Sequence, residues 1–329
     1  MTHGQTSFSD IEYQASRRKT KRQEFLDIMD EIIPWDEWTS LIRPYYHEMG
    51  KPGRPARDLE VMLRMYLMQV WFTLSDVGTE EACIDSHAMH AFLGVDPISD
   101  EVPDATTLAN FRHIMEEAAL DKILFGAITD NLASAGVMYK GGTIIDATFI
   151  ESTASTKNKE KMRDPEMHQA KKGKNWHHGM KLHAGVDAGT GFAHTITTTA
   201  ANVSDIAETC NLIRKDDEVC YLDAGYIGID KRDEITVDEH LKTVEFRVCK
   251  KKSTVKNDVD KAIENRKSSV RSKVEHLFHI IKDIFGLRKT PYRGIAKNTT
   301  RLTMCVLSAN LYMLMMAKRR LDGSPIKAT

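Results

Sequence analysis

Three acidic residues occupy positions where a carboxylate is costly or conspicuous. Asp146 interrupts the apolar, β-branched run Thr143–Ile150, which is typical of a strand covered on both faces. Asp223 directly follows the short apolar run Glu218–Leu222, and Glu275 lies further on in an amphipathic segment. An ionised carboxylate in an apolar layer needs a cation, a metal ion or several hydrogen-bond donors. We therefore take these three carboxylates as candidate ligands of one metal site.

The donor types of this candidate site favour particular metals and one class of reaction. Carboxylate oxygens without a neighbouring cysteine favour Mg²⁺, or Mn²⁺ in its place, over zinc. Two such ions about 3.5–4 Å apart can hold the attacking and leaving oxygens of an in-line phosphoryl displacement. The residue types thus point to metal-dependent phosphoryl transfer, with a pair of ions as the cofactor.

The segment Arg271–Gly286 is predicted to be the helix that carries Glu275. Its apolar residues recur at helical spacing and would pack on a sheet: Val274, Leu277, Phe278, Ile281, Ile284 and Phe285. At about 100° per residue, Arg271, Glu275 and Lys282 fall on one stripe beside that face. In many proteins this pattern is a surface ion-pair ladder. Next to two further carboxylates, the cations would instead neutralise phosphate oxygens.

The segments around the acidic residues predict two domains, a helical domain at 1–138 and a mixed α/β domain at 139–329. In the second domain we expect a strand, a two-stranded hairpin, and then helices alternating with strands. This order is used by ribonuclease H-like nucleases, so the predicted fold class is a ribonuclease H-like mixed sheet preceded by an all-α domain. The expected elements are strands at 143–150, 180–187, 192–199, 218–222 and 243–249, and helices at 205–215, 231–240 and from 271.

The first domain has features that suit DNA binding. A helix that opens at Pro103-Asp104 would expose Thr106, Thr107, Asn110 and Arg112, as in a helix-turn-helix protein, although any small helical bundle has the same pattern. The segment Gly50–Arg57 is either a linker or an arm whose Arg54 and Arg57 reach DNA. Further on, the stretch 157–174, with Lys171, Lys172 and Lys174, is either a basic loop or a DNA-end contact.

The overall composition is that of an ordinary soluble protein. The chain of 329 residues has 41% hydrophobic and 28% charged residues and a formal net charge of −1, which hides three local basic runs that make a polyanionic partner plausible. Five scattered cysteines indicate reduced thiols and a cytoplasmic location. The segment Leu302–Ala317 is too short to span a bilayer, so we expect a buried helix and no membrane contact.

Several short motifs together resemble those of DDE transposases of the insertion-sequence-five family. They extend over nearly the whole chain, and their combination in this order is specific where each alone is weak. The motifs are Leu74–Asp76, Val102–Thr107, Phe111–His113, Thr143–Thr148, Ser155–Glu160, Asp164–His168, Gly179–Lys181, Gly185–Asp187, Ala201–Val203, Asp223–Tyr226, Lys273–His276 and Tyr292–Gly294.

This resemblance implies a helical DNA-binding domain, a ribonuclease H-like catalytic domain, and Asp146, Asp223 and Glu275 as the metal-binding triad. Arg271 and Lys282 match the spacing of the Arg-x3-Glu-x6-Lys signature of the related class, whereas Ser268 replaces a tyrosine that many members carry. We expect a prokaryotic, nucleoid-associated transposase that binds terminal inverted repeats and target DNA as a dimer or larger assembly. The alternatives are a metal-dependent nuclease of the same fold and a catalytically inactive DNA-binding repressor.

Overall fold

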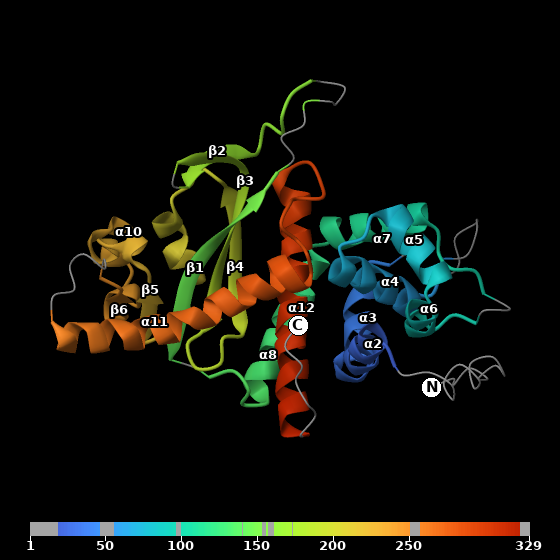
Figure 1. The fold of residues 1–329 in the computed structure, drawn as a ribbon, viewed down its shortest axis with the longest axis horizontal. Helices are drawn as coiled ribbons and strands as arrows, with labels where there is room; N and C mark the ends of the chain where they lie inside the picture. Colours follow the sequence, from blue (N-terminus) through green and yellow to red (C-terminus); the bar gives the residue numbers. More distant parts are fainter. Residues whose placement is uncertain are drawn as a thin grey trace. The chain divides into compact units, whose positions relative to one another are not determined.

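The computed structural model describes residues 19–46, 56–96, 100–139, 141–152, 156, 161–172, 174–250 and 257–322 (Figure 1). The chain divides into two compact units, Met1–Leu120 with Leu311–Thr329 and Asp121–Asn310. This division places helix α8 (Leu120–Ser134) almost entirely with the second unit, whereas the predicted boundary at 138 places it with the first. The two functional domains at 1–138 and 139–329 remain a prediction.

The first unit is helical, as its sequence pattern predicts. Thr20, Asp58, Ser75 and Asp104 each accept a hydrogen bond from a backbone N–H in the first turn of the helix that follows, so local capping sets these helix starts. The apolar helix at 59–72 forms the core of the unit, with most of its side chains buried. The helices are α2 (Lys21–Ile32), α3 (Trp35–Ile42), α4 (Leu59–Phe72), α5 (Asp76–Asp85), α6 (His87–Leu93) and α7 (Ala105–Glu117).

The second unit is built on a mixed sheet of six strands. β1 (Gly142–Glu151) pairs antiparallel with β3 (Asn175–Asp187), and β3 pairs antiparallel with β4 (Ala193–Ala200). On the other side, β5 (Val219–Leu222) is parallel to β1, and β6 (Glu245–Val248) is parallel to β5. Three antiparallel strands followed by two parallel ones give the ribonuclease H-like sheet, so the predicted fold class is confirmed. The additional strand β2 (His168–Lys172), which pairs with β3, was not predicted.

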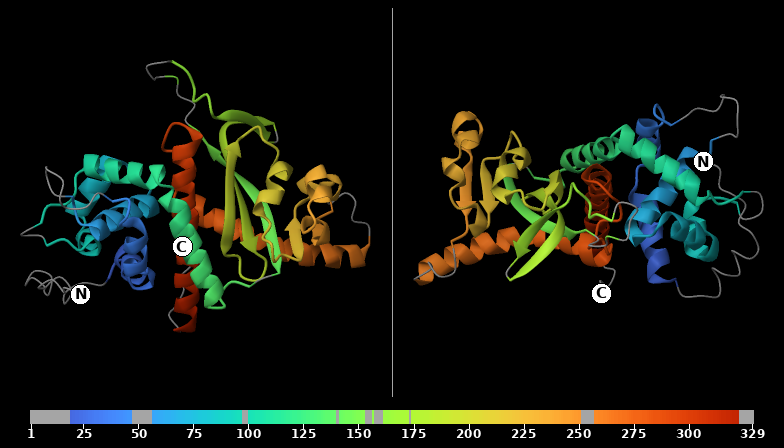
Figure 2. Two further views of the ribbon diagram at one scale, coloured as in Figure 1. Left: turned by 180° about the vertical axis from the view of Figure 1, so that it is seen from behind. Right: turned by 90° about the horizontal axis from the view of Figure 1, so that it is seen from above.

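The two faces of the sheet are covered differently. The long helix α11 (Asp258–His279) packs on one face, as the right-hand view of Figure 2 shows. On the other face an apolar cluster joins Ile145 of β1 to Cys220 and Leu222 of β5 and to the short helices beyond. The helix predicted at 205–215 is only a 3-10 turn, η1 (Asp205–Glu208), followed by α9 (Thr209–Leu212). The helix predicted at 231–240 is likewise reduced to α10 (Asp233–Val237) within a series of short turns.

Two long helices differ from their predicted extents. α11 begins at Asp258, capped by Asn257, well before the predicted start at Arg271. The prediction missed these first turns because their mostly polar residues show no apolar periodicity. α12 (Ile295–Leu321) is long and apolar enough to cross a membrane, but 72% of its most apolar window is buried inside the protein. Asn310 of α12 bonds both the N–H and the C=O of Ala193, at 2.9 and 2.8 Å, which ties this helix to β4.

A buried polar network anchors the start of β1. Asp217, whose side chain is fully buried, accepts hydrogen bonds from the Thr143 hydroxyl, from the backbone N–H of Arg214 at 2.8 Å and from the Arg214 guanidinium at 2.9 Å. The Thr143 hydroxyl also lies 3.0 Å from Nε2 of His194. Burial holds the pKa of His194 at about 3, so this imidazole is neutral. The network fixes the strand on which Asp146 lies.

Candidate active site

Asp146 lies in the middle of β1, directly after the buried pair Ile144 and Ile145. Its side chain is 20% exposed. Oδ1 accepts the N–H of Ala147 at 2.8 Å. Burial raises the pKa of Asp146 to about 6, partly offset by the Ala147 N–H and by Arg271, while the charges of Asp223 and Asp205 raise it further. This carboxylate is ionised at neutral pH but poorly compensated, so a bound cation would stabilise it.

Asp223 acts on Asp146 from the neighbouring strand. β1 and β5 are parallel, and their last pair, Ile144 with Tyr221, lies two residues before the two aspartates on each strand. The charge of Asp223 raises the pKa of Asp146. Asp223 begins the 3-10 helix η2 (Ala224–Tyr226), and its Oδ1 accepts the N–H of Gly225 at 2.7 Å. A Cβ at Gly225 would lie 2.9 Å from that oxygen, so glycine leaves the carboxylate its space.

Helix α11 brings the third carboxylate to the same face. Val274, Leu277 and Phe278 are buried against the sheet, which is the apolar face that the sequence predicts. Arg271 lies between two acids, with Nη1 3.5 Å from Oδ2 of Asp146 and Nη2 3.2 Å from Oε1 of Glu275. The Glu275 side chain is 62% exposed. Arg271 therefore links Glu275 to Asp146 in this structure.

Lys282 lies in a turn that is not α-helical, so the stripe predicted for Arg271, Glu275 and Lys282 stays a prediction. Residues Ile280–Ile284 form a π-helical turn, which rotates less per residue than an α-helix, so extrapolation at about 100° per residue fails there. Lys282 is half-buried in this turn. Its predicted contact with phosphate remains a prediction.

The donor set fits a hard divalent cation, although the ligands are not gathered. Within the described ranges, no three His, Cys, Asp or Glu side chains lie close enough together to hold a metal ion. The charge of Asp223 nevertheless acts on Asp146, and Glu275 is exposed and can change its side-chain conformation. Carboxylate oxygens are the ligands that Mg²⁺ and Mn²⁺ prefer, and the poorly compensated Asp146 supplies a reason for a cation to bind.

The predicted DNA-binding residues of the helical unit differ in how exposed their side chains are. Thr106 is exposed on α7 and Thr107 is half-buried, while Arg57 is half-buried with a 3.1 Å ion pair to Glu101. The expectation that Arg112 is exposed is wrong. Its side chain is 9% exposed, and its guanidinium binds Asp76 of α5. Arg54 lies outside the described residues.

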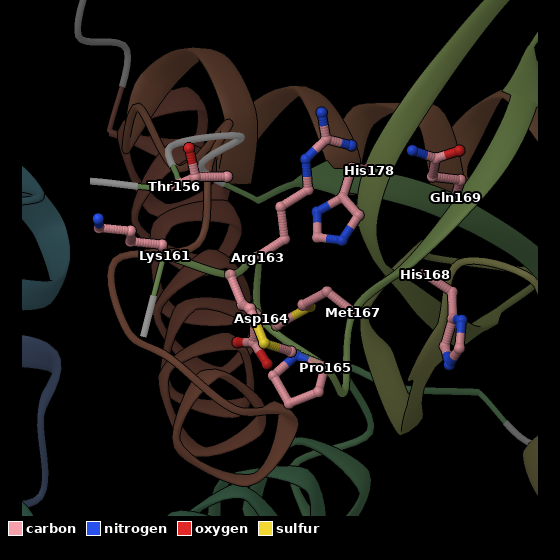
Figure 3. Close-up of a pocket in the computed structure, with 10 residues that line it drawn as sticks. Thr156, Lys161, Arg163, Asp164, Pro165, Met167, His168, Gln169 and His178 are labelled. Carbon is pink, nitrogen blue, oxygen red and sulfur yellow. The ribbon is translucent and has the colours of Figure 1, made fainter. Parts of the chain in front are cut away.

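The basic stretch before β3 is partly a strand rather than only a loop. Lys171 lies on β2 and is exposed, as is Lys174 just before β3. Lys172 also belongs to β2, but its side chain is outside what the structure describes. An open cavity of about 620 Å³ adjoins this hairpin (Figure 3), and its lining includes Lys161 and Arg163. Cationic side chains thus gather around the first strand of the hairpin.

Two motifs singled out in the sequence meet at this cavity. Asp164 accepts the N–H of Gly294 at 2.6 Å, and Glu166 accepts the N–H of Ile295 at 2.8 Å. Both acids therefore satisfy free N–H groups at the start of α12, where a negative charge is favourable. The motif at 164–168 has a structural explanation, which the sequence alone did not provide.

Comparison with protein families agrees with both units. Residues 140–311, more than half of the chain, match the family described as "Transposase DDE domain", and residues 14–114 match "Transposase domain (DUF772)". No solved structure matches the chain. The first match spans β1, β5 and α11, the elements that carry or directly precede the three acidic residues. The chain belongs to the DDE-domain transposase family.

Proposed function

We propose that this chain is a transposase of the insertion-sequence-five type. In this proposal it binds the terminal inverted repeats of its own element, cleaves DNA to free a 3′ hydroxyl at each end, and joins that hydroxyl to target DNA. The observation that supports the proposal is that Asp146 lies within electrostatic reach of Asp223 and 3.5 Å from Arg271, the guanidinium that also binds Glu275.

Asp146, Asp223 and Glu275 are the residues that we propose hold the metal, Mg²⁺ or Mn²⁺ and a pair of ions. When bound, the metal activates the attacking oxygen and stabilises charge on the phosphate. Arg271 binds Asp146 and Glu275 in the present structure. Once these two acids ligate a cation, its guanidinium is available for a phosphate oxygen of the DNA. Lys282 is proposed to bind a phosphate near the scissile bond.

DNA contacts outside the catalytic residues are proposed on both units. On the helical unit they involve Arg57 together with Thr106 and Thr107 at the start of α7, and Arg54 retains its predicted role. On the second unit, Lys171, Lys172 and Lys174 would bind the phosphate backbone near the cavity of Figure 3. Arg112 is left out because its guanidinium is held by Asp76.

The assembly and location follow from this reaction. Pairing two DNA ends requires two sets of binding sites, so we propose a homodimer or a larger assembly on DNA. The proposed place of action is the nucleoid in a prokaryotic cytoplasm. Burial of α12 within the protein is consistent with a role that needs no membrane.

A strand-transfer assay on precleaved end DNA tests the proposal. The wild type in Mg²⁺ should join the 3′ ends to target DNA. Asp146→Asn, Asp223→Asn and Glu275→Gln should not join them, while each still shifts end DNA in a gel. Asp258→Asn is a matched control, because Asp258 is an almost fully exposed carboxylate of the same helix as Glu275. It should join as the wild type does.

Two results would replace the proposed activity by another. Wild-type cleavage without any joining would identify a nuclease of the same fold. Binding to end DNA without cleavage or joining, in either Mg²⁺ or Mn²⁺, would identify a DNA-binding repressor. Full joining by Asp146→Asn would contradict the assignment of the site.

A further inference from the structure

A fourth carboxylate, that of Asp205, lies close to Asp146 and Asp223. Asp205 is the first residue of η1, and η1 packs on η2, the short helix that Asp223 begins. β5 pairs with β1 only as far as Ile144, and in the described part of the chain the next pairing on that side is the single bridge at Glu151. The turns η1 and η2 therefore approach Asp146 along a stretch of β1 that β5 leaves free.

Electrostatics link the three aspartates, although among the described residues their side chains are not gathered closely enough to hold a metal ion. After burial, the largest influence, the negative charges of Asp223 and Asp205 both raise the pKa of Asp146. The same three carboxylates also raise the pKa of Tyr226, the last residue of η2. Asp146 and Tyr226 are therefore both within electrostatic reach of Asp205.

Lys181 of β3 holds Asp205, and His183 of the same strand faces it. Nζ of Lys181 lies 2.9 Å from Oδ1 of Asp205, and the same ammonium donates to the C=O of Val203 at 2.7 Å. Nδ1 of His183 lies 3.8 Å from the same carboxylate oxygen, while its Nε2 is 2.8 Å from the Thr199 hydroxyl. Lys181 thereby fixes both the carboxylate and the backbone that leads into it. Such support is what a metal ligand needs.

Two buried polar groups beside this cluster have no hydrogen-bond partner. The hydroxyl of Tyr226, which is 2% exposed, and Nδ1 of His183, which is fully buried, make no hydrogen bond. An unpaired buried polar group destabilises the folded protein unless another molecule supplies the missing bond. Both groups lie next to the acidic residues, one among all three carboxylates and one facing Asp205. A polar ligand that belongs in this cluster would satisfy them.

Building on the proposed function, we propose that Asp205 is a further metal ligand of the active site, alongside Asp146 and Asp223. Lys181 is a positioning residue that holds its carboxylate. The ligand class is a hard divalent cation, Mg²⁺ or Mn²⁺, because the donors are carboxylate oxygens. The site then contains four acids, with Asp205 contributed by the turn before β5 and Glu275 by α11.

Direct Mn²⁺ binding to the full-length protein tests this proposal without relying on activity. Isothermal titration should give an Mn²⁺ affinity about tenfold weaker or more for Asp205→Asn, since even residues that only support a ligand affect affinity by that order. The rise in Tm caused by Mn²⁺ should shrink in parallel. Glu208→Gln is the matched control, since Glu208 ends the same 3-10 helix and its negative charge also raises the pKa of His183. It should bind Mn²⁺ as the wild type does.

The outcomes separate this proposal from the proposed function. Wild-type Mn²⁺ affinity in Asp205→Asn overturns the role of Asp205 and leaves the triad intact. That role is also overturned if Asp205→Asn lowers Tm in EDTA but shows the full Mn²⁺-dependent rise, because Asp205 then serves only as the partner of Lys181. Equal weakening in Glu208→Gln would show a general charge effect and would overturn it as well. A wild type that binds no Mn²⁺ would contradict the metal dependence itself, and this inference with it.

A second variant covers the case in which Asp205→Asn does not fold. Asp205→Glu keeps the negative charge and the Lys181 partner but moves the carboxylate by one methylene. Its Mn²⁺ affinity should fall severalfold, because divalent cations require defined ligand positions. Unchanged affinity in Asp205→Glu would overturn the proposal.

Discussion

Two aspartates of the same unit, Asp217 fully buried and Asp146 largely buried, have opposite surroundings. Asp217, near the start of β1, accepts hydrogen bonds from Thr143 and from both the backbone and the guanidinium of Arg214. Asp146, in the middle of β1, accepts one backbone N–H at 2.8 Å and has one guanidinium at 3.5 Å. It also lies within electrostatic reach of two other acids. One carboxylate is compensated by the protein itself, and the other is not.

This difference separates a structural acid from a candidate functional one. A buried charge with a full set of donors stabilises a fold only while all its partners remain. A buried charge with too few donors and with acidic neighbours destabilises the apoprotein and is retained where a cation binds. The contrast predicts that removing Asp217 will cost stability, whereas removing Asp146 will cost activity.

The largest expected effect is the loss of catalysis in Asp146→Asn. Strand transfer should fall by about three orders of magnitude or more, because a metal ligand and its negative charge are removed from the transition state. The affinity for end DNA and the Tm in EDTA should not fall. A strand-transfer time course measures the loss of activity, while gel-shift titrations and thermal unfolding in EDTA measure the affinity for end DNA and the Tm. The contrast with Asp217 would be lost if Asp146→Asn had a much lower Tm and its remaining activity simply matched the fraction of protein that is folded.

The next effect is on stability in Asp217→Asn. The free energy of unfolding should fall by about 3 kcal/mol, because the charge that pairs with Arg214 is lost and an amide N–H₂ replaces one of the two buried acceptor oxygens. Urea unfolding followed by circular dichroism measures it. Glu218→Gln, the neighbouring acid, is the control and should change the value little. Unaltered stability in Asp217→Asn would mean that the network does not anchor β1.

A smaller effect is the pH dependence of stability in the metal-free protein. The folded pKa of Asp146, about 6, is above the ordinary value of 3.8. The unfolded chain therefore ionises first, and stability is lost as pH rises from about 4 to about 6 and is constant above that range. The loss should be about 2 kcal/mol, after allowance for the part of the side chain that water reaches.

The comparison of wild type with Asp146→Asn in EDTA isolates this contribution. The variant should match the wild type near pH 4 and exceed its unfolding free energy above pH 6. Added Mg²⁺ should remove the difference by stabilising only the wild type. A difference that does not change with pH would show that Asp146 is not the group that titrates.

The smallest effects concern the cationic residues assigned to DNA. Lys171→Ala should weaken end binding severalfold and reduce the slope of log affinity against log salt by about one. Arg112→Met should leave that slope unchanged but lower Tm, because Arg112 is held by Asp76. Fluorescence anisotropy at several salt concentrations and thermal unfolding distinguish the two. A reduced salt slope in Arg112→Met would restore its predicted role in DNA binding.

Much of the second unit follows from local sequence. The run at 143–150, the acid after β5 and the apolar period around Glu275 are set by neighbouring residues, and the structure places all three on the predicted elements. Helix α7 likewise begins after its predicted cap, Asp104. In these cases alternation, periodicity and capping act within one segment, so the sequence is sufficient.

The remaining features depend on residues far apart in the chain. Arg112 is buried because Asp76, 36 residues earlier, accepts its guanidinium, and no local pattern indicates that pair. The turn at Ile280–Ile284 is π-helical although its apolar residues fit an α-helix. Asp205 follows the motif Ala201–Val203, but its proximity to Asp146 depends on where β5 stops pairing with β1. Only the folded chain brings these groups together.

The most direct test of the central claim exchanges one carboxylate oxygen ligand for sulfur. Asp223→Cys should be inactive in strand transfer with Mg²⁺, which binds thiolate poorly, and should regain activity with Mn²⁺, which tolerates it better. The wild type should join DNA ends with both metals, and Asp223→Ala with neither. This dependence on the metal would place the side chain at position 223 in contact with the ion. Mg²⁺-dependent joining by Asp223→Cys at the wild-type rate would contradict the assignment of Asp223 as a catalytic metal ligand.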